Sequence, residues 1–212
     1  MHDTASNPVT VAVVPVRTFE GAKSRLGAVL DAEERRDLVE RLLRRTVRAA
    51  VATRGIAAVI VVSPDPEVLA VAGAEGATPL TQRSRGLNPA LGEARDAATA
   101  AGATRLLVIP ADLPEITAGD LAVVLDAGDR VGAPSVVLVP DRHGRGTNAL
   151  LLTPADVIDP AFGGDSRAAH AWLAESADAA YVEVADVLRL DLDTPDDLLL
   201  VEAIRPEALG VD

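Results

Sequence analysis

Short apolar runs alternate with longer helical patterns along the chain. Val9 to Val16 is an apolar run interrupted only by Thr10, which is typical of a strand that is buried on both faces of a parallel sheet. From Asp31 onward the apolar residues recur at helical spacing, and Asp31 followed by Glu34 matches a capping box. The opening of the chain therefore predicts a buried strand and then a long amphipathic helix.

The same alternation continues to the end of the chain. The further predicted strands are 57–63, 105–110, 135–140, 148–153, 180–184 and 188–191. The further predicted helices are 66–74, 88–101, 118–126, 166–175 and one that begins at Pro195. This order indicates a three-layer α/β/α sandwich with a mostly parallel sheet. The short polar connection between 135–140 and 148–153 indicates a hairpin, so the sheet is expected to be mixed.

One domain accounts for this pattern, because no repeat, low-complexity tract or linker interrupts it. We expect a flexible N-terminus over 1–8, a single domain over 9–206 and a C-terminal tail over 207–212. The apolar runs fall short of the roughly 18 residues that span a bilayer, and the start lacks the features of a secretory signal. These observations favour a cytoplasmic protein with no membrane partner.

Composition narrows the chemistry further. The 212 residues include no cysteine, which excludes disulfides, cysteine-ligated metals and thiol nucleophiles. Twenty Lys and Arg against 32 Asp and Glu give a net charge of −12, which disfavours a nucleic-acid partner. Anionic ligands must therefore be held by a local basic site, and Lys23 is the only lysine among the basic residues.

In an open parallel sheet, ligands bind beyond the carboxyl ends of the strands. The loop after the first strand carries Arg17, Lys23 and Arg25 around Gly21. Cations and free backbone N–H groups in such a loop can hold a polyphosphate. The loop matches neither the Walker loop nor the dinucleotide fingerprint, and a solvated basic loop is the alternative interpretation.

Carboxylates follow two later strands. Asp112 comes directly after the predicted strand 105–110, and Asp191 and Asp193 lie on the same side of an extended segment. One or two carboxylates, completed by phosphate oxygens and water, suit Mg²⁺. The alternatives are a turn cap at Asp112 and a helix cap at Asp193 or Thr194.

Two further loops carry groups suited to anions. Arg85 can pair with phosphate and Asn88 with a nucleoside, although Asn88 also suits a helix N-cap. Gly163, shortly before Ser166 at a helix start, is typical of a small anion-binding nest, with an ordinary N-cap at Ser166 as the alternative.

The histidines and the single tryptophan suggest no chemistry. His2, His143 and His170 show no metal spacing, and His143 is interpreted as a surface residue. No nucleophile elbow or His–Asp pairing is evident, which disfavours covalent serine catalysis. Trp172 lies at helical spacing and is expected in the core.

Six segments, taken in order, resemble the 2-phospho-L-lactate guanylyltransferase family, which includes the phosphoenolpyruvate guanylyltransferases of deazaflavin coenzyme F-420 biosynthesis. They are PVRTFEGAKSRL, GLNPAL, ADLP, GTN, FGGDS and DLDTPDDL, and they cover nearly the whole chain. The resemblance implies the nucleotide-diphospho-sugar transferase (GT-A-like) fold. It also implies that the phosphate of phosphoenolpyruvate or 2-phospho-L-lactate attacks the α-phosphorus of GTP and releases pyrophosphate, with Mg²⁺ as cofactor.

The resemblance also assigns residues. Thr147, Gly163 and Ser166 match the positions for the three-carbon phospho-acid. Asp112, with Asp191 or Asp193, matches the magnesium carboxylates.

Other matching positions fall on the nucleotide. Lys23 and Arg25 match the segment expected to hold the GTP phosphates, and Asn88 matches the segment near the nucleoside. With Arg17 and Arg85 they complete the predicted nucleotide-binding set, in which Lys23 and Asp112 are the expected catalytic residues. The first loop has a single glycine, unlike the glycine-rich loop of broader sugar-nucleotide transferases, so its cations carry the prediction.

Three alternatives stay open on the sequence alone. A nucleotidyltransferase acting on the molybdenum cofactor would need a roomier acceptor site than GTN and FGGDS indicate. A GT-A-like glycosyltransferase would usually have a DxD pair where this chain has Ala111, Asp112 and Leu113. A nucleotide-binding module without catalysis is the third. The choice between phosphoenolpyruvate and phospholactate, and the oligomeric state, are left open.

Overall fold

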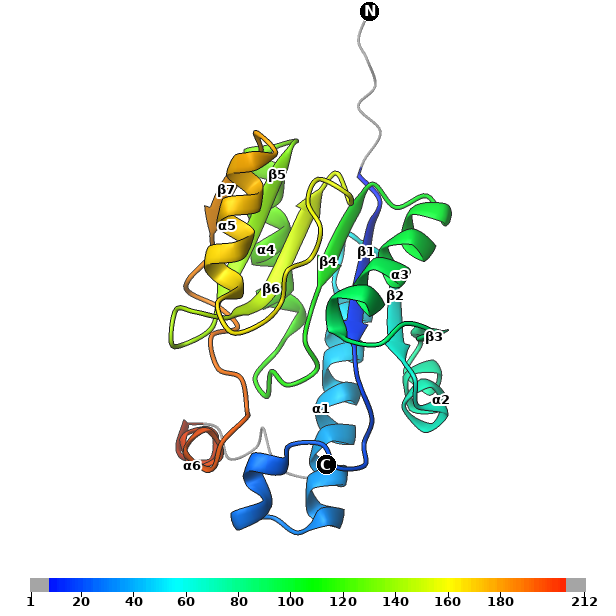
Figure 1. Cartoon of the computed structure of the whole chain (residues 1–212), viewed down its shortest axis with the longest axis vertical. Coiled ribbons are helices and arrows are strands. Elements are labelled where there is room, and N and C mark those ends of the chain that lie inside the picture. The colour runs from blue at the N-terminus through cyan, green and yellow to red at the C-terminus, as the bar shows by residue number, and fades with distance from the viewer. Residues whose placement is uncertain (1–7, 205–212) are drawn as a thin grey trace, which may run out of the picture.

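A seven-stranded sheet forms the centre of the molecule, for which the computed structural model describes residues 8–204 (Figure 1). Its strands are β1 (Thr10–Pro15), β2 (Ile56–Ser63), β3 (Thr78–Thr81), β4 (Arg105–Val108), β5 (Ser135–Pro140), β6 (Thr147–Thr153) and β7 (Ala180–Glu183). They lie in the order β3-β2-β1-β4-β6-β5-β7. Strand β6 is antiparallel to β4 and β5, and the other pairs are parallel, which confirms the mixed, mostly parallel sheet.

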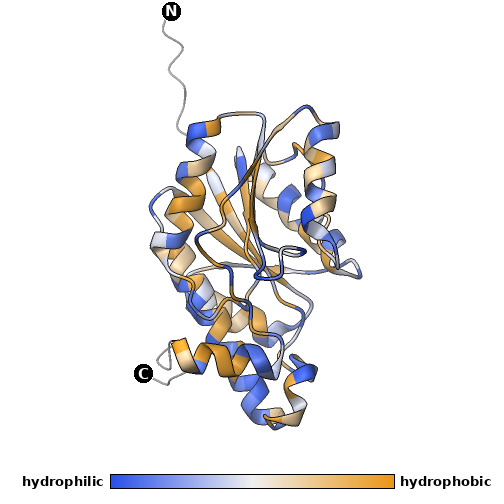
Figure 2. Cartoon of the chain, turned by 90° about the vertical axis from the view of Figure 1, so that its left-hand side faces the viewer, coloured by the Kyte–Doolittle hydropathy of each residue, from blue (hydrophilic) through white to orange (hydrophobic). Residues whose placement is uncertain are grey.

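Helices cover both faces of this sheet. They are α1 (Ala32–Ala52), α2 (Pro66–Ala74), α3 (Leu87–Ala100), α4 (Ala118–Val131), α5 (Ser166–Ser176) and α6 (Pro195–Ile204), with a 3₁₀ helix, η1 (Ser24–Ala28). One core cluster lies under α1, α2 and α4, and a second lies under α3 and α5. Figure 2 shows hydrophobic residues concentrated in the strands between the helical layers. The three-layer α/β/α sandwich is therefore confirmed.

Strand β1 shows why the chain folds this way. Ala12 and Val14 belong to one core cluster, whereas Val11 and Val13 belong to the other. Successive side chains of a strand point to opposite faces, so a continuous apolar run fills both cores at once. The burial predicted for this segment is confirmed.

The start of α1 also follows the prediction. The Asp31 side chain accepts hydrogen bonds from the backbone of Glu33 and Glu34, and the Glu34 side chain accepts one from the backbone of Asp31. This capping box satisfies N–H groups that a helix start leaves without partners.

Several predictions of individual elements were wrong. Segment 188–191 is no strand, because Leu190 packs against α1 and α6 at the edge of the sheet and pairs with no strand. Strand β3 and helix η1 were not predicted. Strand β3 is short, mostly exposed and contains Pro79, so it shows little apolar pattern. Trp172 is 65% exposed, because α5 buries only its other face.

A third, smaller core extends the molecule beyond the carboxyl edge of the sheet. It joins η1, the first half of α1 and α6, and it is built from Leu26, Leu38, Leu42, Leu190, Leu192 and Val201. Figure 1 shows these helices gathered at one end of the molecule, near the carboxyl ends of β1 and β4. This lobe brings the loop after β1 next to the segment that precedes α6.

The predicted ends of the chain lie almost wholly outside the described residues. This applies to the flexible N-terminus over 1–8, apart from Pro8, and to the tail over 207–212. Within the described part of the chain, no helix combines the length and apolar character that a membrane span requires.

Candidate active site

A cleft of about 460 Å³ opens at the carboxyl ends of β1 and β4. Three predicted cations, Arg17, Lys23 and Arg25, line it together with two predicted carboxylates, Asp112 and Asp193. These five residues come from three segments that are far apart in the sequence. The fold brings them together because parallel strands deliver their following loops to one edge of the sheet.

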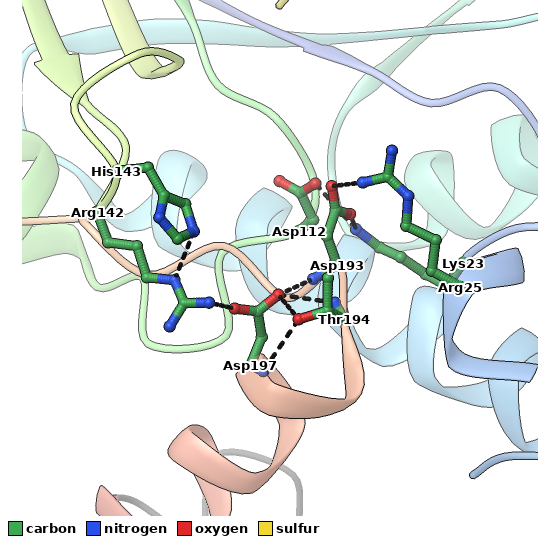
Figure 3. Close-up of polar contacts among 8 residues, drawn as sticks. All are labelled: Lys23, Arg25, Asp112, Arg142, His143, Asp193, Thr194 and Asp197. Carbon is green, nitrogen blue, oxygen red and sulfur yellow. Dashed lines mark hydrogen bonds and ion pairs between the residues drawn. The ribbon is translucent and has the colours of Figure 1, made fainter. Parts of the chain in front are cut away.

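Lys23 lies between the two carboxylates (Figure 3). Its Nζ donates to Asp112 Oδ2 at 2.9 Å and to Asp193 Oδ1 at 2.6 Å. The lysine side chain is only 12% exposed, whereas those of Asp112 and Asp193 are 27% and 42% exposed. Charge-assisted hydrogen bonds of this kind hold the ammonium at a defined point on the cleft wall.

The carboxylates decide the charge state of Lys23. Burial by itself would lower the pKa of the ammonium, but the negative charges of Asp112 and Asp193 and the hydrogen bonds to them outweigh it. The pKa therefore lies above its ordinary value. Lys23 is a cation at neutral pH and can face the phosphates of a bound nucleotide.

Local backbone geometry places these groups. Lys23 has φ 50° and ψ 42°, the left-handed region, immediately before η1. The backbone N–H of Leu192 donates to the carbonyl of Asp112 at 3.0 Å, which holds the two aspartate segments side by side. The carboxylates thus meet through a main-chain contact that no local sequence pattern indicates.

The third predicted carboxylate, Asp191, lies close enough to Asp112 and Asp193 for their charges to shift its pKa. Burial raises the pKa of Asp191, and the charge of Asp112 raises it further, with a smaller effect from Asp193. This repulsion shows that negative charge accumulates around Asp112 and Asp193, although Asp191 itself does not line the cleft.

Helix α6 begins at this wall, and its cap leaves Asp193 available. The Oδ2 atom of Asp197 accepts from the backbone N–H groups of Asp193 (3.0 Å) and Thr194 (2.7 Å). The Thr194 hydroxyl accepts in return from the backbone of Asp197. Thr194 and Asp197 therefore form the cap, so of the two predicted cap residues Thr194 is confirmed and Asp193 is not the cap.

Arg142 extends this network to the β5–β6 hairpin. Its guanidinium pairs with the other oxygen of Asp197 and donates through Nε to His143. His143 is exposed, as predicted. The sequence assigned no role to Arg142 or Asp197, although an acid three residues after a threonine is the signature of a capping box.

A second cleft, of about 700 Å³, adjoins the first and shares Val16, Arg17 and Leu87 with it. Arg85 lines this second cleft and is exposed. Its walls combine apolar side chains with the polar loop that precedes α3. Arg17 thus lies where the two clefts meet, and the predicted nucleotide-binding arginines surround one continuous depression.

Asn88 lies in the first turn of α3, where it does not cap the helix, because the N-cap is Gly86. Its amide instead accepts from the backbone N–H of Phe162 at 2.8 Å and donates to the carbonyl of Phe162 at 3.0 Å. Both hydrogen-bonding groups of Asn88 therefore bind Phe162, which itself lines the first cleft. The N-cap interpretation was wrong, and the predicted contact with a nucleoside stays a prediction.

The structure brings together the residues predicted to hold the phospho-acid. The hydroxyls of Thr147, at the start of β6, and Ser166, the first residue of α5, lie 2.9 Å apart. Gly163 has open space where a side chain would project. Asp165 is the N-cap, so the interpretation of Ser166 as an ordinary N-cap was wrong. Sequence analysis missed His170, whose Nδ1 lies 3.2 Å from Thr147 Oγ1.

The donor set at the cleft suits Mg²⁺ bound with a polyphosphate. Among the described residues, no three His, Cys, Asp or Glu side chains are arranged to hold a metal ion by themselves. Mg²⁺ rarely uses such a cage, because it keeps waters and shares phosphate oxygens with one or two carboxylates. Asp112 and Asp193, which already converge on one cation, fit that requirement.

The fold is shared with solved structures of nucleotidyltransferases and nucleotide-diphospho-sugar transferases. A nucleotidyl transferase from Methanothermobacter thermautotroptrophicus has the same fold, with a TM-score of 0.64 at 17% identity over 95% of this chain and 98% of that chain. The model of one protein family, described as "Guanylyl transferase CofC like", matches residues 10–204. The chain belongs to this family and is a guanylyltransferase, which confirms the resemblance.

Curated relatives agree with this assignment. The phosphoenolpyruvate guanylyltransferase of Sphaerobacter thermophilus is 47% identical over 89% of this chain and 90% of that protein. The phosphoenolpyruvate guanylyltransferase of Rubrobacter xylanophilus is 45% identical over 91% of this chain and 93% of that protein. Similarity therefore extends over nearly the full length of both relatives.

Proposed function

We propose that the chain transfers GMP from GTP to phosphoenolpyruvate and releases pyrophosphate, a step in coenzyme F-420 biosynthesis. An oxygen of the phosphoenolpyruvate phosphate attacks the α-phosphorus of GTP and forms a new P–O bond. The bond from the α-phosphorus to the oxygen shared with the β-phosphate breaks, and that oxygen leaves with the electron pair on pyrophosphate. The names of the curated relatives support this acceptor.

The observation that carries the proposal is the position of Lys23. A charged lysine, held by Asp112 and Asp193 and flanked by Arg17 and Arg25, supplies positive charge where the polyphosphate has to lie. Phosphoryl and nucleotidyl transfer need positioning and charge neutralisation more than covalent help from the protein. Lys23 and the arginines thus stabilise the negative charge that accumulates on departing pyrophosphate.

The two adjoining clefts provide complementary surroundings for GTP. The larger one has apolar walls, including Val62 and Leu87, against which a base can pack, and a polar loop along one side. The smaller one carries the cations and carboxylates. Because Arg17 borders both, a nucleotide that spans the clefts has its phosphates at Lys23.

The acceptor is proposed to bind at the start of α5. The N-terminus of a helix presents free N–H groups and a partial positive charge to an anion. Gly163 leaves room for the anion, and Thr147 and Ser166 provide hydroxyl groups beside it. The phosphate of the acceptor then approaches the α-phosphorus from the side opposite the leaving group.

Magnesium is proposed to bind Asp112 together with Asp191 or Asp193. When bound, it would neutralise phosphate charge and polarise the phosphorus–oxygen bonds. The same aspartates orient Lys23, so the chain contributes one ammonium and two carboxylates to a single point of the cleft. A cytoplasmic location stays a prediction.

The experiment incubates the protein with GTP, Mg²⁺ and either phosphoenolpyruvate or 2-phospho-L-lactate, and measures pyrophosphate and the mass of the product. We expect pyrophosphate and a guanylylated phosphoenolpyruvate, with less product from phospholactate and from ATP or CTP. Release of GDP in place of pyrophosphate would show cleavage between the β- and γ-phosphates, which is not guanylyl transfer. Absence of pyrophosphate with both acids would overturn the proposal.

A further inference from the structure

A buried line of hydrogen bonds links two residues proposed to bind the acceptor, Thr147 and Ser166, to the ring of His170. The backbone N–H of Ala161 donates to Nε2 of His170 at 2.9 Å. Nδ1 of the same ring lies 3.2 Å from Thr147 Oγ1, and Thr147 Oγ1 lies 2.9 Å from Ser166 Oγ. His170 is fully buried, and Thr147 and Ser166 are 6% and 2% exposed.

The direction of this line follows from its first member. A backbone N–H can only donate, so Nε2 of His170 must accept and carries no proton. Burial lowers the pKa of His170 to about 4, so the ring is neutral at physiological pH. A neutral imidazole holds one proton, which is therefore on Nδ1, and the ring donates to Thr147.

Counting protons shows what this direction achieves. The hydroxyls of Thr147 and Ser166 have two protons between them, and their mutual hydrogen bond uses one. Because Thr147 accepts from His170, the second proton stays available to a ligand. With the opposite tautomer, Thr147 would donate to the ring and Ser166 to Thr147, so both protons would be used.

We propose that His170 is a positioning residue that keeps one hydroxyl of the Thr147–Ser166 pair free to donate to the anionic acceptor. The proposal rests on the proposed function, because it deepens the role of that same acceptor site. The position of His170 beside the cleft supports this role. Ser166 begins α5, and the ring of Phe162, which lines the cleft, packs edge-on against His170 at 5.1 Å between centroids.

His170 also fixes the loop that carries the acceptor site. It binds the backbone of Ala161, and Asn88 binds the backbone of the next residue, Phe162. Gly163 follows directly. The same ring therefore anchors the loop through Nε2 and orients the hydroxyl pair through Nδ1, and the two roles can be separated by substitution.

Three variants separate them. In His170→Asn, the amide nitrogen can replace the Nδ1 donor toward Thr147. In His170→Gln, the longer side chain can replace the Nε2 acceptor toward Ala161. In His170→Leu, both the Nδ1 donor and the Nε2 acceptor are lost.

We expect His170→Asn to keep the KM for phosphoenolpyruvate within about threefold of wild type. The other two variants should raise this KM about tenfold or more, the usual effect of losing a hydrogen bond to a charged group. The KM for GTP should change less than threefold in all three.

A double variant links the effect to the hydroxyl pair. Ser166→Ala in the His170→Leu background should add little to the loss, because without the Nδ1 donor the free proton of the hydroxyl pair is already no longer directed toward the ligand. Independent, multiplying losses would contradict the proposal. Equal increases in KM for both substrates in every variant would show a merely structural role and would also overturn it.

Nitrogen NMR of the wild-type protein provides a measurement that needs neither variants nor turnover. We expect His170 to show a protonated Nδ1 and an unprotonated Nε2 near neutral pH. The opposite tautomer would overturn the proposal even if guanylyl transfer to phosphoenolpyruvate is observed. If the wild type has this tautomer but does not turn over, the proposed function fails, and binding of phosphoenolpyruvate to wild type and His170→Leu then decides the role of His170.

Discussion

Lys23 combines more structural constraints than any other residue described at the cleft. Its backbone is in the left-handed region, its ammonium binds two aspartates, and its side chain is 12% exposed. A flexible surface lysine would lose rotamer entropy on binding phosphate, whereas this one is already ordered. The aspartates thus hold the charge in position before the nucleotide arrives.

Replacing Lys23 with Met should lower turnover about a hundredfold or more, because a preorganised charge opposite the leaving group is lost. Steady-state kinetics with GTP and phosphoenolpyruvate measure this effect. Arg130→Gln, an exposed change in the last turn of α4, is the matched control and should leave turnover unchanged. Wild-type turnover and GTP affinity in Lys23→Met would contradict the phosphate role.

Asp112→Asn should raise the magnesium concentration needed for half-maximal activity about tenfold or more, because the amide is a poor ligand for a hard cation. Titration of Mg²⁺ at saturating substrates measures this shift. Asp186→Asn, at an exposed aspartate that does not line this cleft, should leave the magnesium dependence unchanged. If Asp112→Asn keeps wild-type turnover and magnesium dependence, the metal assignment is wrong.

At the scale of elements, the start of α6 couples helix stability to the site. Burial would raise the pKa of Asp197, but hydrogen bonds from Thr194 and the backbone of Asp193, with the charge of Arg142, lower it overall. A lowered pKa means that the carboxylate stabilises the folded state above its ordinary pKa of 3.8. This stability is lost as the pH falls through the lower pKa of the folded state.

We therefore expect Asp197→Asn to lower the free energy of unfolding by about 1–3 kcal/mol near neutral pH. The difference from wild type should shrink below about pH 4, where the wild-type carboxylate becomes protonated. Urea unfolding near neutral pH and again below about pH 4 measures the difference in the free energy of unfolding. Asp196→Asn, an exposed aspartate in the same first turn, is the control. A difference that grows in acid would be the opposite sign and would refute the account.

The link between α3 and the loop at Phe162 yields another element-scale prediction. Asn88→Ala removes both hydrogen bonds to Phe162 and should raise the KM for phosphoenolpyruvate about tenfold, with a smaller effect on the KM for GTP. Arg95→Gln removes a different bridge from α3, to Asp159, and serves as the control. A larger effect on GTP would favour the nucleoside contact predicted from the sequence.

At the scale of the whole molecule, a small separate core holds one wall of the site. Leu192 is fully buried in it and lies directly before Asp193. Leu192→Ala should cost about 2–5 kcal/mol of stability, and it should also lower turnover because Asp193 shifts. Val201→Ala, in the same core but away from the aspartates, should lose stability with less effect on turnover. Equal losses of turnover in both variants would contradict this coupling.

Charge is also distributed at this scale. The net charge of −12 describes the molecule as a whole, yet Arg17, Lys23, Arg25 and Arg85 gather around two adjoining clefts. An acidic protein can bind polyanions because electrostatic interactions at short range depend on the nearest charges, and distant surface charges are screened by salt.

Patterns local in the chain determined most of the fold. The buried runs of β1 and β2, the capping box of α1 and the hairpin of β5 and β6 are set by neighbouring residues, and all four follow the predictions. The predictions failed where distant contacts decide the structure. Segment 188–191 packs into the small core, and β3 is ordered by pairing with β2.

The same division applies to the site. Residue types and strand-end positions in the sequence were enough to point to Lys23, Asp112 and the pair of Asp191 and Asp193, because chemistry and loop position are local properties. The sequence left the choice between Asp191 and Asp193 open. Other contacts join segments that are far apart in the chain. They are the hydrogen bonds of Asn88 and His170, the ion pair of Arg142 with Asp197, and the ion pairs of Lys23 with Asp112 and Asp193. Only the tertiary structure decided them, since side-chain distances across such separations follow from how the sheet and helices pack.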